Sequence, residues 1–509
     1  MNVPTDPNPI TGKSTSLFRL PDSRNLFITF ALVTSLFLLW GFCNGMIDIL
    51  NKHFQDSLHI NKQQSGLVQF ANYLGYFLMA VPAGLIARKF GYKGGILVGL
   101  VLIASGAFWL IHAVSIGTYS AFLLGLFVIA AGMTCLETIA NPYTTVLGPP
   151  EHGATRINIA QTFNGVGWIL GPIVGGYFVF GGGGGGLNDA SGAAASATNS
   201  VVTNTTNANA GLFTPYLGIG IFAAVWVLVF IFAPVPDLHA EDESKKSADL
   251  KTSLKPSGSQ LTGIGVALAV VWGLLYFFIA PILGLVWALL NLPANLLDPT
   301  KYGLIVVAYI GSFIVVAKNW DMFRRKHFTL GVVAQFLYVA AQTGIFSFCV
   351  NYIIENDPDV TPAKAATMLG GIGFVLFTVG RLCGSIVISQ FKPHLVLAGY
   401  AIINVVLAAV CMGGGIVGMY AMFGTFFFMS VMYPTIFALG IRGLGDYTKL
   451  GSSLIVMSIV GGAIAAPFMG HIADVHSMRT GFIVPLVCFV LIAIYGAAWQ
   501  MLEARNVKV

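Results

Sequence analysis

Two acidic residues, Asp48 and Glu137, lie inside long apolar runs of the sequence, at 26–50 and 118–146. The other acidic residues fall in tails, in loops or at the ends of such runs. An ionised carboxylate within the hydrocarbon of a membrane costs several kcal/mol, so an acid kept there is paired or takes up a proton. Both positions are therefore candidate proton-exchange sites. The alternative is a structural hydrogen-bond acceptor, and Asp48, near one end of its run, could also meet water.

Amide and aromatic side chains accompany these acids at helical spacing. Asn44 precedes Asp48 by four residues and Asn141 follows Glu137 by four, so each acid shares a helix face with an amide. Further candidates recur along the chain: Gln161 and Asn164, the stripe Gln335, Tyr338 and Gln342, and the aromatic residues Trp40, Phe346 and Tyr433. Amides and phenols both donate and accept hydrogen bonds, and aromatic rings stack on sugar faces, so this set favours a hydroxyl-rich ligand. Each amide taken singly could instead join two helices.

The composition indicates that these residues belong to a membrane protein. Of 509 residues, 56% are hydrophobic and only 9% charged, whereas soluble domains carry about 25% charged residues. Apolar runs long enough to cross a bilayer recur throughout, which predicts an all-α, multi-span membrane protein. The six cysteines all lie in apolar runs, where buried thiols are expected rather than a metal site. The net charge of +6 lies mainly between spans and does not indicate a nucleic-acid partner.

The apolar runs divide the chain into two sets of six. The predicted parts are a tail (1–25), an N-terminal half (26–236), a charged linker (237–260), an extra helix pair with its linker (261–325), a C-terminal half (326–503) and a short tail (504–509). Fourteen spans are predicted, and an even number places both termini on one side. Most Lys and Arg residues share that side, which is then cytoplasmic, in an inner membrane. Residues 182–211, rich in Gly, Ala, Ser and Asn, are predicted to form a flexible loop on the other side.

The two halves repeat a pattern of proline and glycine. A proline lies six residues before a glycine at 142–148 and again at 434–440. The pattern Gly, Pro, Gly at 167–175 recurs with the same spacing at 462–470. Two shared patterns at nearly the same offset indicate duplicated six-helix halves, which is typical of secondary transporters with a substrate site between the halves.

Several stretches resemble a known family. "AGLIARKFGYKGG" (83–95) is similar to the loop motif of the major facilitator superfamily, with Ala87 where an acid is usual. "LETIANPYTTVLG" (136–148), "RINIAQTFNGVG" (156–167) and "YPTIFALGIRGLG" (433–445) closely resemble the fucose–proton symporter family of sugar permeases. The resemblance covers both halves but neither the Gly-rich segment nor 261–319.

This resemblance implies a major facilitator fold and uptake of a monosaccharide with a proton by alternating access, driven by the proton gradient without a cofactor. Asp48 and Glu137 match the family's proton-coupling acids, while Gln161, Asn164 and Tyr433 match its sugar-binding residues. The helix-one motif departs from the family, since "NGMID" (44–48) keeps Asn44 but has apolar residues at two amide positions. Phe346 stands where the fucose carrier has a tryptophan. The sugar is expected to be a hexose or deoxyhexose such as fucose, glucose or galactose.

Other functions were weighed against symport. A proton-coupled antiporter of small organic molecules would need a more aromatic cavity with fewer amides. A cation-coupled sugar carrier differs only in its driving ion, and a facilitated sugar carrier has none. An enzyme is disfavoured because the nine histidines lie in loops, tails or span ends and form no metal or nucleophile motif. A channel would need a ring of subunits, whereas duplicated halves within one chain favour a monomer.

Overall fold

The computed structural model describes residues 18, 26–148, 153–180, 200–233, 235–236, 258–289, 293–444 and 447–504. These residues form helices and the turns between them, with no strand in the described ranges. Helices are expected because, in lipid, every backbone N–H and C=O must be bonded within its own segment. The predicted linker 237–260 and both tails lie almost entirely outside the described residues.

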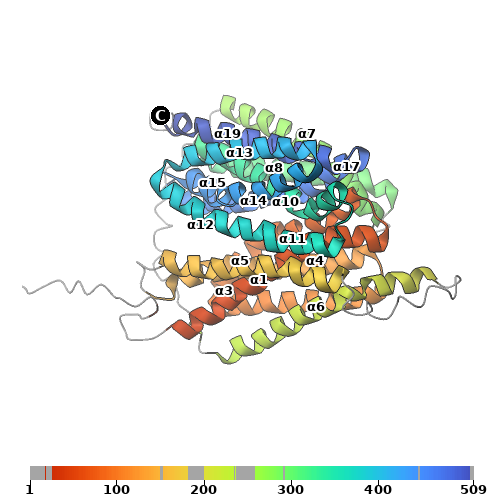
Figure 1. Ribbon diagram of the computed structural model, residues 1–509. Coiled ribbons are helices and arrows are strands. Elements are labelled where there is room, and N and C mark those ends of the chain that lie inside the picture. The colour runs from red at the N-terminus through yellow and green to blue at the C-terminus, as the bar shows by residue number, and fades with distance from the viewer. Residues whose placement is uncertain are drawn as a thin grey trace, which may run out of the picture.

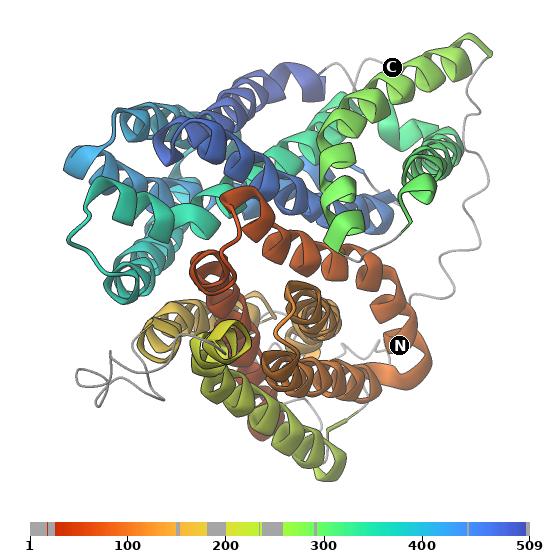
Figure 2. The ribbon, with the colours of Figure 1, turned by 90° about the vertical axis from the view of Figure 1, so that its right-hand side faces the viewer.

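The N-terminal half forms the lower layer in Figure 1. Its helices are α1 (Phe27–Leu58), α2 (Lys62–Ser65), α3 (Leu67–Ile116), α4 (Tyr119–Val146), α5 (Gly153–Gly175), continued by a π-turn (Gly176–Phe180), and α6 (Ser200–Phe232). The extra pair consists of α7 (Gly258–Leu289) and α8 (Leu297–Lys318), followed by the short α9 (Trp320–Phe323). Figure 2 shows α7 and α8, in green, beside the C-terminal half, where α7 contacts α8 and α17.

The C-terminal half forms the upper layer, coloured cyan to blue. Its helices are α10 (Lys326–Asn356), α11 (Pro362–Met368), a π-helical segment (Leu369–Phe374), α12 (Val375–Gln390), α13 (Pro393–Gly413), α14 (Gly415–Met429), α15 (Met432–Ile441), α16 (Thr448–Met457), a 3-10 turn (Ser458–Val460), α17 (Gly461–Val475), α18 (Met478–Gly481) and α19 (Ile483–Ala504). These elements match the six apolar runs predicted for this half.

Twelve helical segments of the described chain are long and apolar enough to cross a membrane. They include α8 but not two of the fourteen predicted spans, 64–90 and 261–291. Both of these ranges are nonetheless helical, the first as the beginning of α3 and the second as α7. That these two segments also cross the membrane therefore stays a prediction, and so does the count of fourteen spans.

Three local predictions need correction. Residues 200–211, predicted as loop, begin the long helix α6, while 181–199 lie outside the described residues. The predicted loop 84–95 is only a break within α3, at Gly91, whose φ of 72° is a conformation that glycine adopts without strain. Cys383 is exposed on α12 rather than buried, unlike the other five cysteines.

Glycines bring α1 and α5 into backbone contact. A Cβ added to Gly167 would meet the backbone of Leu38 and Phe42, and one added to Gly41 would meet the carbonyl of Asn164. Small residues at such a crossing let two helices approach closely, which is how helices associate in membranes. This contact fixes α5, and the amides it carries, against α1.

The two prolines of the repeated pattern act differently. Pro434 follows an interruption at residues 430–431, where α14 ends and α15 begins. Because proline has no N–H, the carbonyl of Ser430 lacks its helical donor there, which is compatible with the break. The equivalent helix α4 runs unbroken past Pro142 to Val146. The proline of this repeated pattern thus accompanies a helix break in the C-terminal half only.

Candidate functional site

Asp48 lies on α1 and is almost completely buried, with 4% of its surface exposed. Its Oδ1 accepts a hydrogen bond from Nε2 of Gln69 on α3, at 2.8 Å. Its Oδ2 is buried with no hydrogen-bond partner among the described residues. The alternative that Asp48 simply meets water at the end of its helix is therefore wrong for this structure, and one carboxylate oxygen remains available for a proton.

Glu137, on α4, is half-buried. Its charge acts on three phenols, those of Tyr73 and Tyr76 on α3 and that of Tyr433 on α15. Two of these belong to the N-terminal half and one to the C-terminal half. The charge of Glu137 therefore acts on groups of both halves, which places this acid near the boundary between them.

Tyr76, on α3, accepts hydrogen bonds from two candidate residues of α1. Nε1 of Trp40 donates to its hydroxyl at 2.7 Å, and Nδ2 of Asn44 reaches the same oxygen at 3.5 Å. The amide of Asn44 also donates to the backbone carbonyl of Trp40, at 3.2 Å. Trp40 and Asn44, both predicted to bind the ligand, are thus held together by a tyrosine that the sequence analysis did not single out.

The two amides predicted on α5 have different surroundings. Nε2 of Gln161, which is half-buried, donates to Oδ1 of Asn141 on α4 at 3.1 Å. Asn164 is 5% exposed, and its Nδ2 donates to the backbone carbonyl of Phe37 on α1 at 3.2 Å. Gln161 therefore faces the side of α4 that carries Glu137 and Asn141, whereas the donor of Asn164 joins α5 to α1.

The C-terminal half contributes Gln342 and Tyr433, both half-buried. Next to Gln342, the hydroxyl of Thr343 donates to that of Tyr73 at 2.9 Å, a hydrogen bond that crosses between the halves. The rings of Tyr433 and Tyr338 lie edge to face, with centroids 6.2 Å apart. Residues of α3, α10 and α15 therefore meet around the acid on α4.

Two further polar side chains of α10 are fully buried. The hydroxyl of Tyr338 and both amide atoms of Gln335 have no hydrogen-bond partner among the described residues. Buried polar groups are normally satisfied, and an orphaned one commonly marks a water or a ligand. Both residues belong to the stripe that the sequence analysis identified in 328–354.

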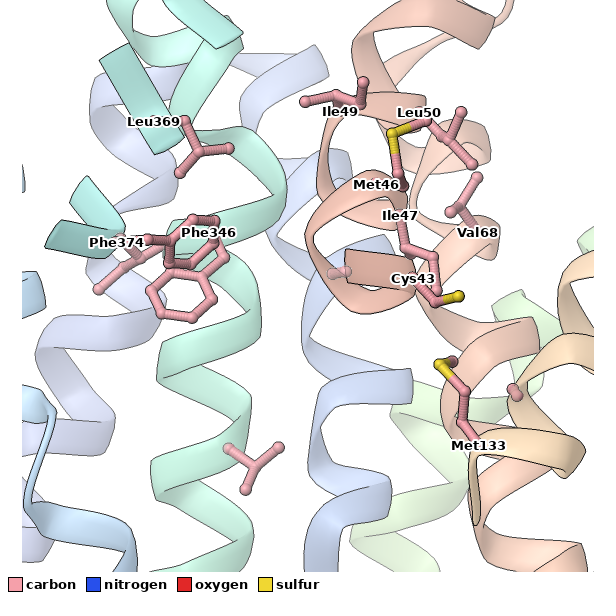
Figure 3. Packing of buried hydrophobic residues seen from close by; sticks show 14 of the residues in the cluster. Cys43, Met46, Ile47, Ile49, Leu50, Val68, Met133, Phe346, Leu369 and Phe374 are labelled. Carbon is pink, nitrogen blue, oxygen red and sulfur yellow. The ribbon is translucent and has the colours of Figure 1, made fainter. Parts of the chain in front are cut away.

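Phe346 lies in an aromatic cluster rather than among the polar side chains. It is 3% exposed and stacks on Phe426, with centroids 4.7 Å apart, and it contacts Phe374 and, from the N-terminal half, Trp168. Figure 3 shows Phe346 beside Phe374. Its predicted role in stacking on a sugar stays a prediction, and in this structure its ring is covered by protein.

Helix α3 contributes polar side chains that were not among the candidates predicted from the sequence. Gln69, Tyr73 and Tyr76 lie on one face of that helix, spaced by four and three residues. The same helical spacing revealed the stripe in 328–354, so the signal was present in 64–90 as well.

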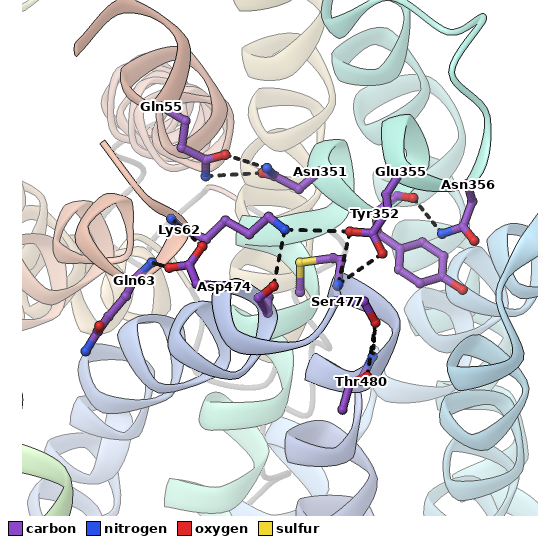
Figure 4. Close-up of polar contacts among 12 residues, drawn as sticks. Gln55, Lys62, Gln63, Asn351, Tyr352, Glu355, Asn356, Asp474, Ser477 and Thr480 are labelled. Atoms are coloured by element: carbon purple, nitrogen blue, oxygen red, sulfur yellow. Dashed lines mark hydrogen bonds and ion pairs between the residues drawn. The ribbon is translucent and has the colours of Figure 1, made fainter. Parts of the chain in front are cut away.

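At one end of the molecule, which we call the closed end, the two halves are joined by side chains. Gln55 at the end of α1 and Asn351 on α10 exchange hydrogen bonds through their amides (Figure 4). One turn deeper, Nδ2 of Asn51 donates to the backbone carbonyl of Ser347, at 3.2 Å. The closed end therefore lies above the polar site, along the same two helices.

The short helix α2 completes the closed end. Asp474 of α17 accepts hydrogen bonds from the backbone N–H groups of Lys62 and Gln63, at 3.0 and 2.8 Å. A carboxylate is well placed there because the first N–H groups of a helix have no partner within it. The ammonium of Lys62 also lies 3.6 Å from the carboxylate of Glu355, as Figure 4 shows.

Comparison with known proteins identifies the fold. The model of the Major Facilitator Superfamily matches residues 26–457. The chain belongs to this superfamily. Within it, the chain belongs to the family of the L-fucose-proton symporter of Escherichia coli (strain K12), with 35% identity over 478 residues and 93% of each chain covered. A glucose/galactose transporter of Brucella abortus (biovar 1, strain 9-941) is 28% identical, covering 97% of this chain and 98% of its own.

Solved structures agree with this assignment. A crystal structure of the E. coli fucose:proton symporter matches with a TM-score of 0.58 and 33% identity, covering 94% of this chain and 99% of that one. The xylose transporter XylE of E. coli, in an inward open conformation, matches with a TM-score of 0.60 at 11% identity, which supports the fold alone. The predicted all-α major facilitator fold and the resemblance to the sugar permeases are therefore confirmed, and this superfamily member is a multi-pass membrane protein.

Proposed function

We propose that this protein takes up a hexose or deoxyhexose together with a proton by alternating access. The observation that carries the proposal is an acid, Glu137, whose charge acts on phenols of both halves, in a chain that is 35% identical to a fucose–proton symporter. Because other relatives are glucose/galactose transporters, the proposal covers the class of sugar rather than one member of it.

Glu137 is the proposed coupling residue. An ionised carboxylate between two closing halves loses water, whereas a protonated one does not carry that penalty. A carrier that holds sugar while Glu137 is ionised therefore resists closing, and the carrier loaded with both proton and sugar closes. Sugar and proton are coupled because both bind more tightly to the same state of the carrier, so binding of one favours binding of the other.

Asp48 is the second proposed proton site. It is buried below the closed end, with a single hydrogen-bond donor, Gln69, on one oxygen and no partner on the other. A carboxylate satisfied on one side only is suited to take up and release a proton as its surroundings change. We place the sugar between Gln161 and Asn141 on one side and Gln342 and Tyr433 on the other, with Trp40, Asn44, Asn164 and Phe346 as the remaining predicted contacts.

The orientation follows from the positive-inside rule. Most Lys and Arg residues lie on the side of the two termini, so we assign that side to the cytoplasm and the closed end to the outside. The closed end, where α1 and α10 end, then shuts the sugar site from the outer solution. We infer that the protein acts as a monomer in the inner membrane, because the two halves of one chain supply both sides of the site.

The test is transport in proteoliposomes. We expect L-fucose, D-glucose or D-galactose added outside to alkalinise the outer solution as protons enter with the sugar. Glu137→Gln, which keeps the shape but not the titration, should retain exchange of sugar across the membrane and lose accumulation against a gradient. If this variant still accumulates sugar, the coupling role is wrong.

The alternatives give different outcomes in the same vesicles. Uptake that depends on Na⁺ and ignores an uncoupler would identify a cation-coupled carrier. Equilibration without accumulation in the wild type would identify a facilitated carrier. Proton movement opposite to the substrate would identify an antiporter.

A further inference from the structure

The hydroxyl of Tyr76 accepts hydrogen bonds from two groups that can only donate. The indole Nε1–H of Trp40 has no lone pair to offer, and it lies 2.7 Å from the phenolic oxygen. The second neighbour is Nδ2 of Asn44, at 3.5 Å. The orientation of this amide is settled by chemistry, because the same atom faces the carbonyl of Trp40, which can only accept.

The phenolic oxygen of Tyr76 is therefore used as an acceptor, and its own O–H must point elsewhere. No hydrogen bond within the described part of the chain has Tyr76 as its donor. The side chain is half-buried, and the charge acting most strongly on it is that of Glu137. Tyr76 thus has a hydroxyl proton free to donate, on a phenol whose oxygen is held by Trp40 and Asn44 and on which the charge of Glu137 acts.

We propose that Tyr76 is a sugar-binding residue that only donates, and that ionised Glu137 and an oxygen of the sugar compete for its O–H. This inference rests on the proposed function and adds to it a specificity residue on α3. The ligand group it selects is a sugar hydroxyl whose oxygen accepts the hydrogen bond.

The competition supplies a link between proton and sugar. When Glu137 is ionised, its carboxylate is the stronger acceptor and holds the O–H of Tyr76. When Glu137 takes up a proton, it becomes a weaker acceptor, and the O–H turns to the sugar. Sugar binding then strengthens on protonation through Tyr76, without any movement of the helices that carry it.

The test uses the full-length protein in proteoliposomes and measures equilibrium exchange of L-fucose, D-glucose and D-galactose. Tyr76→Phe removes only the hydroxyl, and we expect its half-saturation concentration for the exchanged sugar to rise about 2- to 10-fold, the worth of one hydrogen bond. The matched control is Tyr216→Phe on α6, which removes a buried hydroxyl that has no hydrogen-bond partner among the described residues and should leave exchange unchanged.

Sugar analogues locate the contact. At the position that Tyr76 contacts, a deoxy analogue should bind wild type and Tyr76→Phe equally, since the hydrogen bond is absent in both. In the wild type alone, a fluoro analogue at that position should bind better than the deoxy analogue, because fluorine accepts but cannot donate. This second measurement holds even if Tyr76→Phe does not fold.

The outcomes separate the two proposals. Unchanged half-saturation in Tyr76→Phe, or equal loss with fluoro and deoxy analogues at every position, overturns the assignment of Tyr76 while sugar transport stands. Failure of the wild type to exchange any of the three sugars overturns the proposed function and, with it, the sugar as the acceptor for Tyr76.

Discussion

Individual polar side chains in this protein divide into those that hold helices together and those with capacity left for a ligand. Asn164 belongs to the first group through its hydrogen bond to the carbonyl of Phe37. Gln161 and Gln342 are half-buried, and Asp48 keeps one oxygen without a partner. An amide at a position that matches a sugar-binding residue of the family is thus not by itself a ligand contact. In a helix bundle the same amide can instead donate a hydrogen bond to a backbone carbonyl.

Asn164→Asp should destabilise the protein through this hydrogen bond. The change replaces a buried donor with an acceptor facing a carbonyl, and we expect a loss of about 1–3 kcal/mol, measured as a lower thermal midpoint in detergent. Gln161→Glu is the matched comparison, because its half-buried side chain can reach water and should lower the midpoint less. Equal midpoints for Asn164→Asp and wild type would show that the hydrogen bond to Phe37 does not hold α5.

At the scale of elements, close contacts and caps fix the helices that carry the site. The α1–α5 crossing depends on glycine, as described for Gly41 and Gly167. Lys93 donates to the carbonyls of Ile231, near the end of α6, and of Ala233, just after it. Buried Arg156, at the start of α5, donates to the carbonyl of Thr144 near the end of α4. Such contacts satisfy the carbonyls that every helix end leaves open.

Gly167→Ala should separate α1 from α5. Its Cβ would meet backbone atoms of α1, which cannot move aside as a flexible side chain would, and we expect a loss of about 1–3 kcal/mol or more. Gly218→Ala is the control, because an added Cβ there contacts nothing within 4 Å. In the helix interior that change should be neutral or stabilising by up to about 1 kcal/mol. The unfolding midpoints of both variants, measured in the same detergent, show whether the α1–α5 contact depends on this glycine.

For the whole molecule, the contact between the halves follows the internal repeat. Gln55 on α1 faces Asn351 on α10, and these helices are the first of the two duplicated halves. Their contact therefore lies near the axis that relates the halves. Alternating access requires the halves to separate at this end, so the amide pair and the contacts of Lys62 with Asp474 and Glu355 must break in each cycle.

Cross-linking the closed end should stop transport. We expect Gln55→Cys combined with Asn351→Cys, joined by a short bifunctional methanethiosulfonate, to lose sugar uptake and to regain it on reduction. The control pair is Gln55→Cys with Ser65→Cys, which lies within the N-terminal half and also forms a side-chain hydrogen bond in the wild type, at 2.8 Å. Continued transport by the first pair when fully cross-linked would show that this end does not open.

The sequence by itself revealed the apolar runs, the acids Asp48 and Glu137 and the duplicated Pro/Gly pattern. Hydrocarbon allows few backbone structures and penalises charge, so length and composition determine helices and mark the exceptional carboxylates. The partners of those residues were decided only by tertiary structure. Which helix faces meet depends on packing between segments far apart in the chain. That packing brings Gln69 into hydrogen-bond contact with Asp48, and it brings Tyr76 into contact with Trp40 and Asn44. It also enclosed Phe346 among rings from both halves, which no local pattern could reveal.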